Sequence, residues 1–247
     1  MKYNFSILKL SHTNSFLLKT KDGYLMIDSG YEWDRDRLIK KLDKLNVRVG
    51  QITHLLLTHH HDDHCGLVNF IVEKNPRISV IMHQECVKLI RKGETDMSGG
   101  GGYINATIRF LSLVFKMLNP EWNRTFPPYT VRPADIIISR EDGDELRRIG
   151  VDGSIIFTPG HSLDSIALLM DDGVLFAGDA AMNWLKWAGS HYATLFITDT
   201  EQYYASWKKI LARNPRIIFP AHGSSFSPDK LKKNMDRFTN SGLVKMV

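Results

Sequence analysis

Four histidines and two aspartates lie within residues 58–64. Imidazole and carboxylate groups are ligands that suit zinc, iron and manganese, and a catalytic site needs about three protein ligands for each ion plus an open position for water. Residues two apart in an extended chain point the same way, so His59 and His61 can bind one ion. If the chain then turns, Asp63 and His64 can face a second ion. The cluster alone provides too few ligands for two ions.

Further residues of ligand type follow short apolar runs, as the histidine cluster itself follows the run 52–57. They are His161 after 154–157, Asp179 after 174–176 and His222 after 217–219. Proteins of the α/β class place ligands at the carboxyl ends of their strands. We therefore expect these three residues to complete a metal site with the cluster.

The pattern His59-x-His61-x-Asp63-His64, followed in order by His161, Asp179 and His222, resembles the metallo-β-lactamase-fold hydrolase superfamily. Within it, the chain is most similar to the lactonase and glyoxalase II-like branches. The resemblance implies an α/β fold, an αββα sandwich of two mixed β-sheets with outer helices. It also implies which residues bind which ion: His59, His61 and His161 hold one, Asp63, His64 and His222 hold the other, and Asp179 bridges them. We expect two divalent ions, zinc in the first place, with iron and manganese as alternatives.

The same resemblance implies a metal-dependent hydrolase. A water shared by two such ions loses its proton near neutral pH and can attack an ester, lactone or thioester carbonyl. Asp63, a ligand with a second carboxylate oxygen, is the candidate catalytic residue that takes and returns the proton. Asp28, at the end of another apolar run, is expected to orient a ligand, because metal-bound imidazoles donate their other N–H to such groups.

The alternative function is a metal-dependent phosphodiesterase or nuclease, because the same ligand set serves RNA-processing branches of the superfamily. The net charge of 32 − 27 = +5 is modest for a nucleic-acid binder. We therefore expect a small-molecule substrate and no nucleic-acid partner. One position departs from the lactonases, which place a tyrosine three residues after the bridging Asp. Here that residue is Met182, and Tyr192 or His191 is the candidate replacement.

The elements that must position these residues are predicted from hydrophobic periodicity and turn signals. Strands are expected at 2–10, 15–20, 24–27, 52–57, 78–82, 135–138, 145–149, 154–158, 165–170, 174–177 and 216–219. Helices are expected at 34–46, 67–73, 83–92, 201–213 and 228–240. The Asp-Gly pairs at 142–143, 152–153 and 172–173 predict hairpins. The early strands are expected to form a meander that continues into a βαβ unit. Because strands dominate two separate stretches of the chain, we expect two sheets packed together with helices outside.

We expect one hydrolase domain over residues 1–247, with a helical insertion at about 93–130. Within it, glycines at 99–102 precede the mainly apolar stretch 103–118. This stretch either packs on the body or on a second copy in a homodimer, or closes as a lid over an apolar substrate. Trp184, Trp187 and Phe196 either line the same pocket or belong to the core.

The start of the chain, its cysteines and its apolar stretches indicate where in the cell to expect the protein. The start of the chain has no uninterrupted apolar segment of the kind that signal peptides carry, and two cysteines, Cys65 and Cys86, make no disulfide framework. The stretch 103–118 is shorter than the about 20 apolar residues that span a bilayer. We expect a cytoplasmic protein that is not inserted in a membrane.

Overall fold

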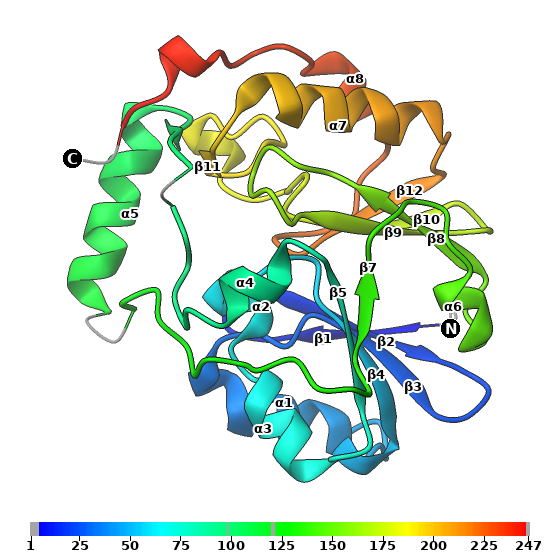
Figure 1. The fold of residues 1–247 in the computed structure, drawn as a ribbon. Coiled ribbons are helices and arrows are strands. Elements are labelled where there is room, and N and C mark those ends of the chain that lie inside the picture. Colours follow the sequence, from blue (N-terminus) through cyan, green and yellow to red (C-terminus); the bar gives the residue numbers. More distant parts are fainter. Residues whose placement is uncertain (1–4, 98, 120–121, 246–247) are drawn as a thin grey trace. The chain divides into compact units, whose positions relative to one another are not determined.

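The computed structural model describes residues 5–97, 99–119 and 122–245 (Figure 1). Its contacts divide the chain into two compact units, each built on its own sheet. Unit 1 comprises Met1–Thr95 and Arg124–Ser154, and unit 2 comprises Asp96–Asn123 and Ile155–Val247. The expectation of one domain over 1–247 stays a prediction.

Unit 1 contains a six-stranded sheet in the order β1-β2-β3-β4-β5-β7. Its strands are β1 (Phe5–Lys9), β2 (Asn14–Lys19), β3 (Tyr24–Ile27), β4 (Ile52–Leu56), β5 (Ser79–His83) and β7 (Ile136–Ile138). The first three strands pair antiparallel, while β3, β4, β5 and β7 pair parallel, so the sheet is mixed. The predicted meander and βαβ unit are confirmed.

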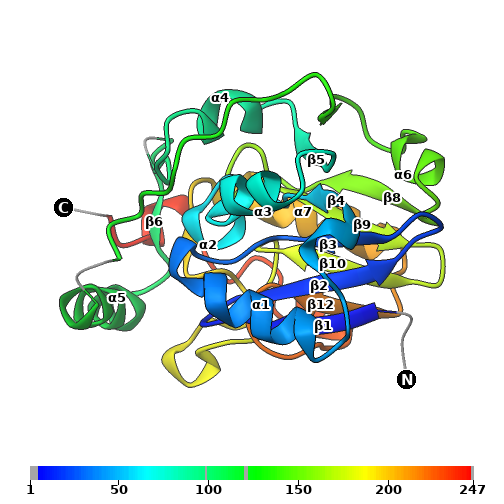
Figure 2. The same ribbon diagram turned by 90° about the horizontal axis from the view of Figure 1, so that it is seen from below.

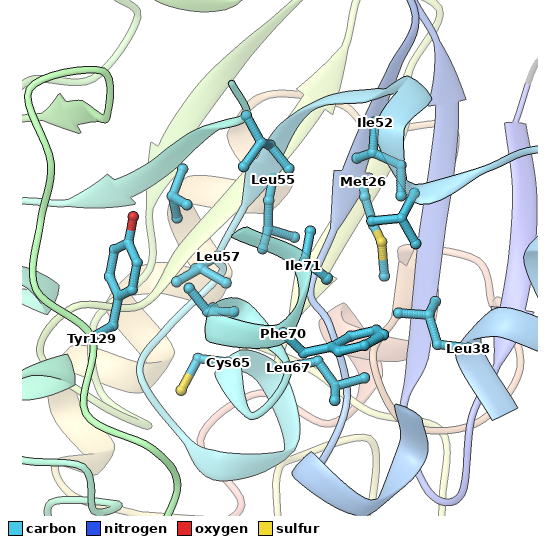
Figure 3. Close-up of a cluster of buried hydrophobic side chains, with 14 of the residues drawn as sticks. Met26, Leu38, Ile52, Leu55, Leu57, Cys65, Leu67, Phe70, Ile71 and Tyr129 are labelled. Carbon is cyan, nitrogen blue, oxygen red and sulfur yellow. The ribbon is translucent and has the colours of Figure 1, made fainter. Parts of the chain in front are cut away.

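The helices of unit 1 are short. They are α1 (Arg35–Asp43), α2 (Asp62–Cys65), α3 (Val68–Lys74), α4 (Cys86–Ile90) and α6 (Glu145–Arg148), with 3-10 turns at Glu32–Asp34 and Val49–Gln51. All but α2, which buries Asp62, Asp63 and His64, bury an apolar side. Helices α1 and α3 lie on the same face of the sheet (Figure 1, Figure 2). Leu38 of α1 and Ile71 of α3 join Met26 and Leu55 of the strands in one fully buried cluster (Figure 3). This core fixes β4, whose carboxyl end leads into the histidine cluster.

Unit 2 contains a four-stranded mixed sheet in the order β12-β10-β9-β8 and the small pair β11-β6. The strands are β6 (Gly102–Tyr103), β8 (Gly153–Phe157), β9 (Ile166–Met170), β10 (Val174–Gly178), β11 (Phe196–Ile197) and β12 (Ile217–Pro220). The helices are α5 (Ala106–Leu118), α7 (Thr200–Ala212) and α8 (Asp229–Lys233), with 3-10 turns at Lys186–Ala188 and Asn240–Gly242. Trp207 of α7 is fully buried, and its Nε1 donates to the carbonyl of Ala180 at 2.6 Å. Helix α7 is thereby attached beside the end of β10.

Residues 93–130, predicted as an insertion, belong partly to each unit. The chain passes from unit 1 to unit 2 after Thr95 and re-enters unit 1 at Arg124, and the residues on either side of this segment are paired. Glu94 and Thr125 form an antiparallel bridge, and the Thr95 N–H donates to the Arg124 carbonyl at 2.8 Å. Between them, residues 96–123 contribute β6 and α5 to unit 2. Positions 98, 120 and 121 lie outside the described residues.

Helix α5 begins three residues later than the apolar stretch 103–118 predicts. Tyr103 lies in β6, and the side chain of Asn105 caps the helix by accepting from the Ile108 N–H at 2.8 Å. Phe110, Leu113 and Met117, at spacings of three and four, are all more than half exposed. A lid and a homodimer contact through residues 103–118 both remain predictions.

Three other predictions are wrong. The segment predicted as a strand at 145–149 forms helix α6 over Glu145–Arg148, a turn that buries Leu146 and is spanned by the ion pair of Asp144 and Arg148 at 2.7 Å. The pairs at 142–143 and 152–153 consequently join no hairpin, whereas that at 172–173 joins antiparallel β9 and β10. The predicted helix 228–240 is limited to α8, after which Tyr204 holds the irregular chain by accepting from the Phe238 N–H at 3.1 Å.

The architecture is therefore α/β with two mixed sheets and helices, as the sequence predicts. Among residues 5–97, 99–119 and 122–245, no helix combines the length and the apolar character that crossing a membrane requires.

Leu55→Ala tests the core of unit 1. Leu55 lies on β4 and is fully buried. Removing its branched end leaves a cavity, so we expect the free energy of unfolding to fall by about 2–5 kcal/mol. The same substitution at Leu113, which is 51% exposed on α5, should change it by less than about 0.5 kcal/mol. Urea unfolding checks both values, and equal losses would contradict the assignment of Leu55 to the core.

Candidate metal centre

The first half of the candidate centre lies in unit 1, directly after β4, and we call it the first half-site: His59, His61, Asp63 and His64. All four residues are buried, although the side chain of Asp63 is 13% exposed. The ring of His59 lies 4.4 Å from that of His61 and 3.9 Å from that of His64, centroid to centroid. The turn that the sequence predicts after His61 is the short helix α2, which brings His64 back beside His59. The sequence cluster is thus a cluster in space.

Asp28 fixes the orientation of His64. The Nδ1–H of His64 donates to Asp28 Oδ2 at 2.8 Å, because a carboxylate oxygen can only accept here. The backbone N–H of Thr58 donates to Asp28 Oδ1 at 2.8 Å, and the Thr58 hydroxyl donates to Oδ2, also at 2.8 Å. With its proton on Nδ1, the neutral His64 ring has its lone pair on Nε2, which is the form that binds a metal. Asp28 thus orients His64, and the binding of a metal by His64 stays a prediction.

Thr58 extends this control to His59. Because the Thr58 hydroxyl gives its proton to Asp28, its oxygen is left to accept from His59 Nδ1 at 3.2 Å. His59 is thus also the tautomer with its proton on Nδ1 and its lone pair on Nε2. Thr58 stands directly before the histidine cluster, but residue spacing gave no sign of its role.

The two oxygens of Asp63 have different neighbours. Oδ1 lies 3.5 Å from His64 Nε2, whereas Oδ2 accepts from the buried hydroxyl of Thr13 at 3.2 Å. Thr13 belongs to the turn between β1 and β2, fifty residues away in sequence. Asp63 therefore offers Oδ1 on the side of the imidazole rings, while Thr13 occupies Oδ2.

Asp62, next to Asp63, has an altered acidity. Burial, and then the negative charge of Asp63, raises the pKa of Asp62 to about 7. Its Oδ1 accepts from the Thr95 hydroxyl at 3.0 Å, and its backbone N–H donates to the same hydroxyl at 3.1 Å. The hydroxyl of Thr95 thus holds both the backbone and the carboxylate of Asp62.

The second half-site lies in unit 2 and consists of His161, Asp179 and His222, which follow β8, β10 and β12. Asp179 lies between the two imidazoles: Oδ2 is 3.5 Å from His161 Nε2, and Oδ1 is 3.2 Å from His222 Nε2. Each carboxylate oxygen thus faces a different ring. The Thr194 hydroxyl donates to Oδ2 at 3.2 Å and holds the carboxylate in this orientation.

His161 is oriented like His64, from its far side. Its Nδ1–H donates to the carbonyl of Phe196 at 2.8 Å, so its lone pair is on Nε2 beside Asp179. The preceding Gly160 is required by packing: a Cβ there would lie 2.4 Å from the backbone of Tyr203 in α7. The Gly160 carbonyl also accepts from the Thr198 N–H at 2.8 Å and the Asp199 N–H at 3.0 Å. The small residue before this ligand therefore allows α7 to approach closely.

All the predicted ligands are present as buried groups of the required type: His59, His61, Asp63 and His64 in unit 1, and His161, Asp179 and His222 in unit 2. Neutral imidazoles whose Nδ1 is held by an acceptor, together with carboxylates, are a donor set that fits zinc, iron or manganese. The residues of both half-sites therefore fit divalent metal ions. Sequence reasoning missed Thr13, Thr58 and Thr194, whose hydroxyls hold the ligands and the carboxylate behind them.

The loop after Asp179 contains Met182, His191 and Tyr192, the residues compared above with the lactonase tyrosine. Met182 is buried, and its N–H donates to the Tyr192 carbonyl at 2.9 Å. The ring of Tyr192 packs on Phe226 at 4.8 Å, and that of His191 lies 6.3 Å from Phe238. Replacement of the lactonase tyrosine by either residue stays a prediction. Phe196 belongs to the core of unit 2, whereas Trp184 and Trp187 are exposed.

Asp28→Ala tests the support of His64. Without the acceptor at Nδ1, the His64 ring can rotate and can carry its proton on either nitrogen. We therefore expect the affinity for Zn²⁺ to fall about 10- to 100-fold. Competition with a chromophoric chelator measures this affinity. Asp36→Ala, an exposed aspartate of α1, is the control and should leave it unchanged. Equal affinities in all three proteins would contradict the orienting role of Asp28.

Comparison with known proteins is consistent with this site. The chain is 28% identical over 222 residues to the beta-lactamase-like protein 2 homolog of Drosophila melanogaster, covering 90% of this chain and 62% of that protein. It is 25% identical over 234 residues to an atrochrysone carboxyl ACP thioesterase of Aspergillus fumigatus, covering 93% and 57%. The chain thus spans less than two thirds of the length of these curated relatives.

The fold also occurs among solved structures. That of TTHA1623 in a di-iron-bound form matches with a TM-score of 0.62 at 19% identity, covering 93% of this chain and all of that one. The Metallo-beta-lactamase superfamily matches residues 8–222, a span that includes every residue of both half-sites. The fold and the order of the candidate ligand residues along the chain agree with this match. The chain belongs to the metallo-β-lactamase superfamily.

Proposed function

We propose that the two half-sites together hold two divalent metal ions, zinc in the first place. His59, His61 and His161 would bind one ion, Asp63, His64 and His222 the other, and Asp179 would bridge them. The observation that carries the proposal is the position of Asp179, whose two oxygens face different imidazole nitrogens at 3.5 and 3.2 Å. The orientation of His59, His64 and His161 through Nδ1 supports it, because this leaves Nε2 as the ligand atom.

Two such ions would supply Lewis acidity and an activated water at neutral pH. The chain's own residues would then control the proton. We propose that Asp63 accepts it at Oδ2 and later returns it. The Thr13 hydroxyl at this oxygen suits both states, because it donates to the ionised carboxylate and can rotate to accept from the protonated one. Asp63 would thus exchange a proton without losing its hydrogen-bond partner.

The proposed substrate class is an ester, lactone or thioester with a carbonyl as the electrophile, and thioesters are the first candidates. Two relatives that the chain resembles at 24–25% identity are named as thioesterases, in Aspergillus fumigatus and in Emericella nidulans. The chain covers only 57% and 49% of their lengths, so their substrates are a guide to the class and not to the compound.

Removal of metal tests the hydrolase proposal. Protein reconstituted with Zn²⁺ should hydrolyse thioesters or carbonyl esters, and chelation should abolish this activity until Zn²⁺ is restored. The panel should include a lactone and bis-para-nitrophenyl phosphate. Turnover of the phosphodiester alone would replace the proposal by the phosphodiesterase alternative. Turnover of no substrate by protein shown to contain metal would contradict hydrolysis.

Asp179→Ala tests the bridging role. It removes both oxygens that face His161 and His222, so activity should fall by more than the about 10- to 100-fold that loss of an outer hydrogen-bond partner costs. Elemental analysis should show reduced metal content. Asp172→Ala, in the exposed turn between β9 and β10, is the control and should retain both. Full activity of Asp179→Ala would contradict the two-metal arrangement.

A further inference from the structure

The loop 183–193, which follows Asp179, is attached to the chain that carries His222. The Asn183 N–H donates to the His222 carbonyl at 2.8 Å, and its side-chain amide donates to the Ser224 carbonyl at 2.9 Å. Asn183 also forms a parallel bridge with Gly223. A Cβ at Gly223 would lie 2.1 Å from the backbone carbonyl oxygen of Asn183, so the two chains approach closely. The next residue, Trp184, is therefore held in a fixed position beside a ligand of the second half-site.

Trp184 stacks on His222. The indole and imidazole centroids are 6.1 Å apart and the ring planes differ by 24°. The Ser190 hydroxyl donates to the Trp184 carbonyl at 2.5 Å and fixes its backbone. Nevertheless 38% of the residue is exposed. A large aromatic side chain thus contacts a metal-ligand ring and still presents surface to solvent.

The backbone of this loop is in a costly conformation. Leu185, His191 and Tyr192 have φ values of 51°, 49° and 68°, in the left-handed region that residues other than glycine seldom occupy. Internal hydrogen bonds hold them there, among them Ala188 N–H to the Leu185 carbonyl at 2.9 Å and Ala193 N–H to the Ser190 carbonyl at 2.9 Å. Such conformations cluster at active sites and ligand-binding segments. Leu185, the first of the three, directly follows Trp184, so the backbone next to this side chain is held in one conformation.

We propose that Trp184 is a specificity-determining residue whose indole binds the aromatic, planar acyl group of the substrate next to His222. This inference rests on the proposed function and names the substrate class within it. An exposed indole favours an aromatic group over a short alkyl group, because offset stacking adds to the burial of apolar area. A second exposed apolar side chain, Leu163, follows the ligand His161 by two residues and is 58% exposed.

The test compares benzoyl and acetyl thioesters of the same thiol with Zn²⁺-loaded protein. The ratio of kcat/KM for benzoyl over acetyl should fall about tenfold in Trp184→Ala, as expected for one lost aromatic contact. Trp184→Phe should retain most of the preference. Trp187→Ala, which removes an indole of the same loop that is 76% exposed, is the matched control and should leave the ratio unchanged.

A binding measurement separates this inference from the hydrolase proposal. Calorimetry with a non-hydrolysable thioether analogue of the benzoyl thioester should show about tenfold weaker binding to Trp184→Ala than to wild type, also without metal. An unchanged ratio with unchanged binding would overturn the role of Trp184, and so would equal losses for both acyl groups. Wild type that hydrolyses neither thioester would instead overturn the proposed function. Trp184→Leu, which keeps an apolar side chain but removes the ring, serves for all measurements if Trp184→Ala does not fold, and the same fall in the ratio is expected.

Discussion

The candidate centre depends on buried carboxylates whose hydrogen bonds orient imidazole rings. A carboxylate taken out of water is costly unless several donors satisfy it. Asp28 is satisfied by the Thr58 N–H, the Thr58 hydroxyl and His64 Nδ1. Because each of these donors is also part of the chain leading into the histidine cluster, satisfying the charge fixes the ligands at the same time. The parallel neighbours β3 and β4 make this arrangement possible by ending side by side.

Threonine hydroxyls have the same role at three carboxylates. Thr58 contacts Asp28, Thr13 contacts Asp63 and Thr194 contacts Asp179. A hydroxyl can donate or accept as the charge on its partner changes, whereas a backbone N–H can only donate. Pairing with threonine therefore holds a carboxylate in place and still tolerates a change in its protonation or in its ligation.

Much of the fold could be predicted because its signals are local. The run 52–57 and the cluster after it identify β4 and the first half-site, and the Asp-Gly turn at 172–173 identifies the hairpin that leads to Asp179. The strand prediction for 145–149 is wrong because so short a run suits a strand or one helical turn, and the turn that forms buries Leu146 and places Asp144 beside Arg148. Thr13 could not be found from spacing, since its partner Asp63 lies fifty residues away. The packing of Trp184 on His222 likewise depends on tertiary contacts that no periodicity encodes.

The antiparallel bridge between Glu94 and Thr125 bears on how this chain can vary. Thr95 and Arg124, the residues of unit 1 that flank the segment 96–123, are joined by a backbone hydrogen bond of 2.8 Å. Loop closure costs little more as a loop lengthens, so this pairing is compatible with intervening segments of different length. The segment's freedom to vary is nevertheless confined to the exposed side of α5, because Gly102 and Tyr103 are paired with β11 and Ile108 is buried in the core of unit 2.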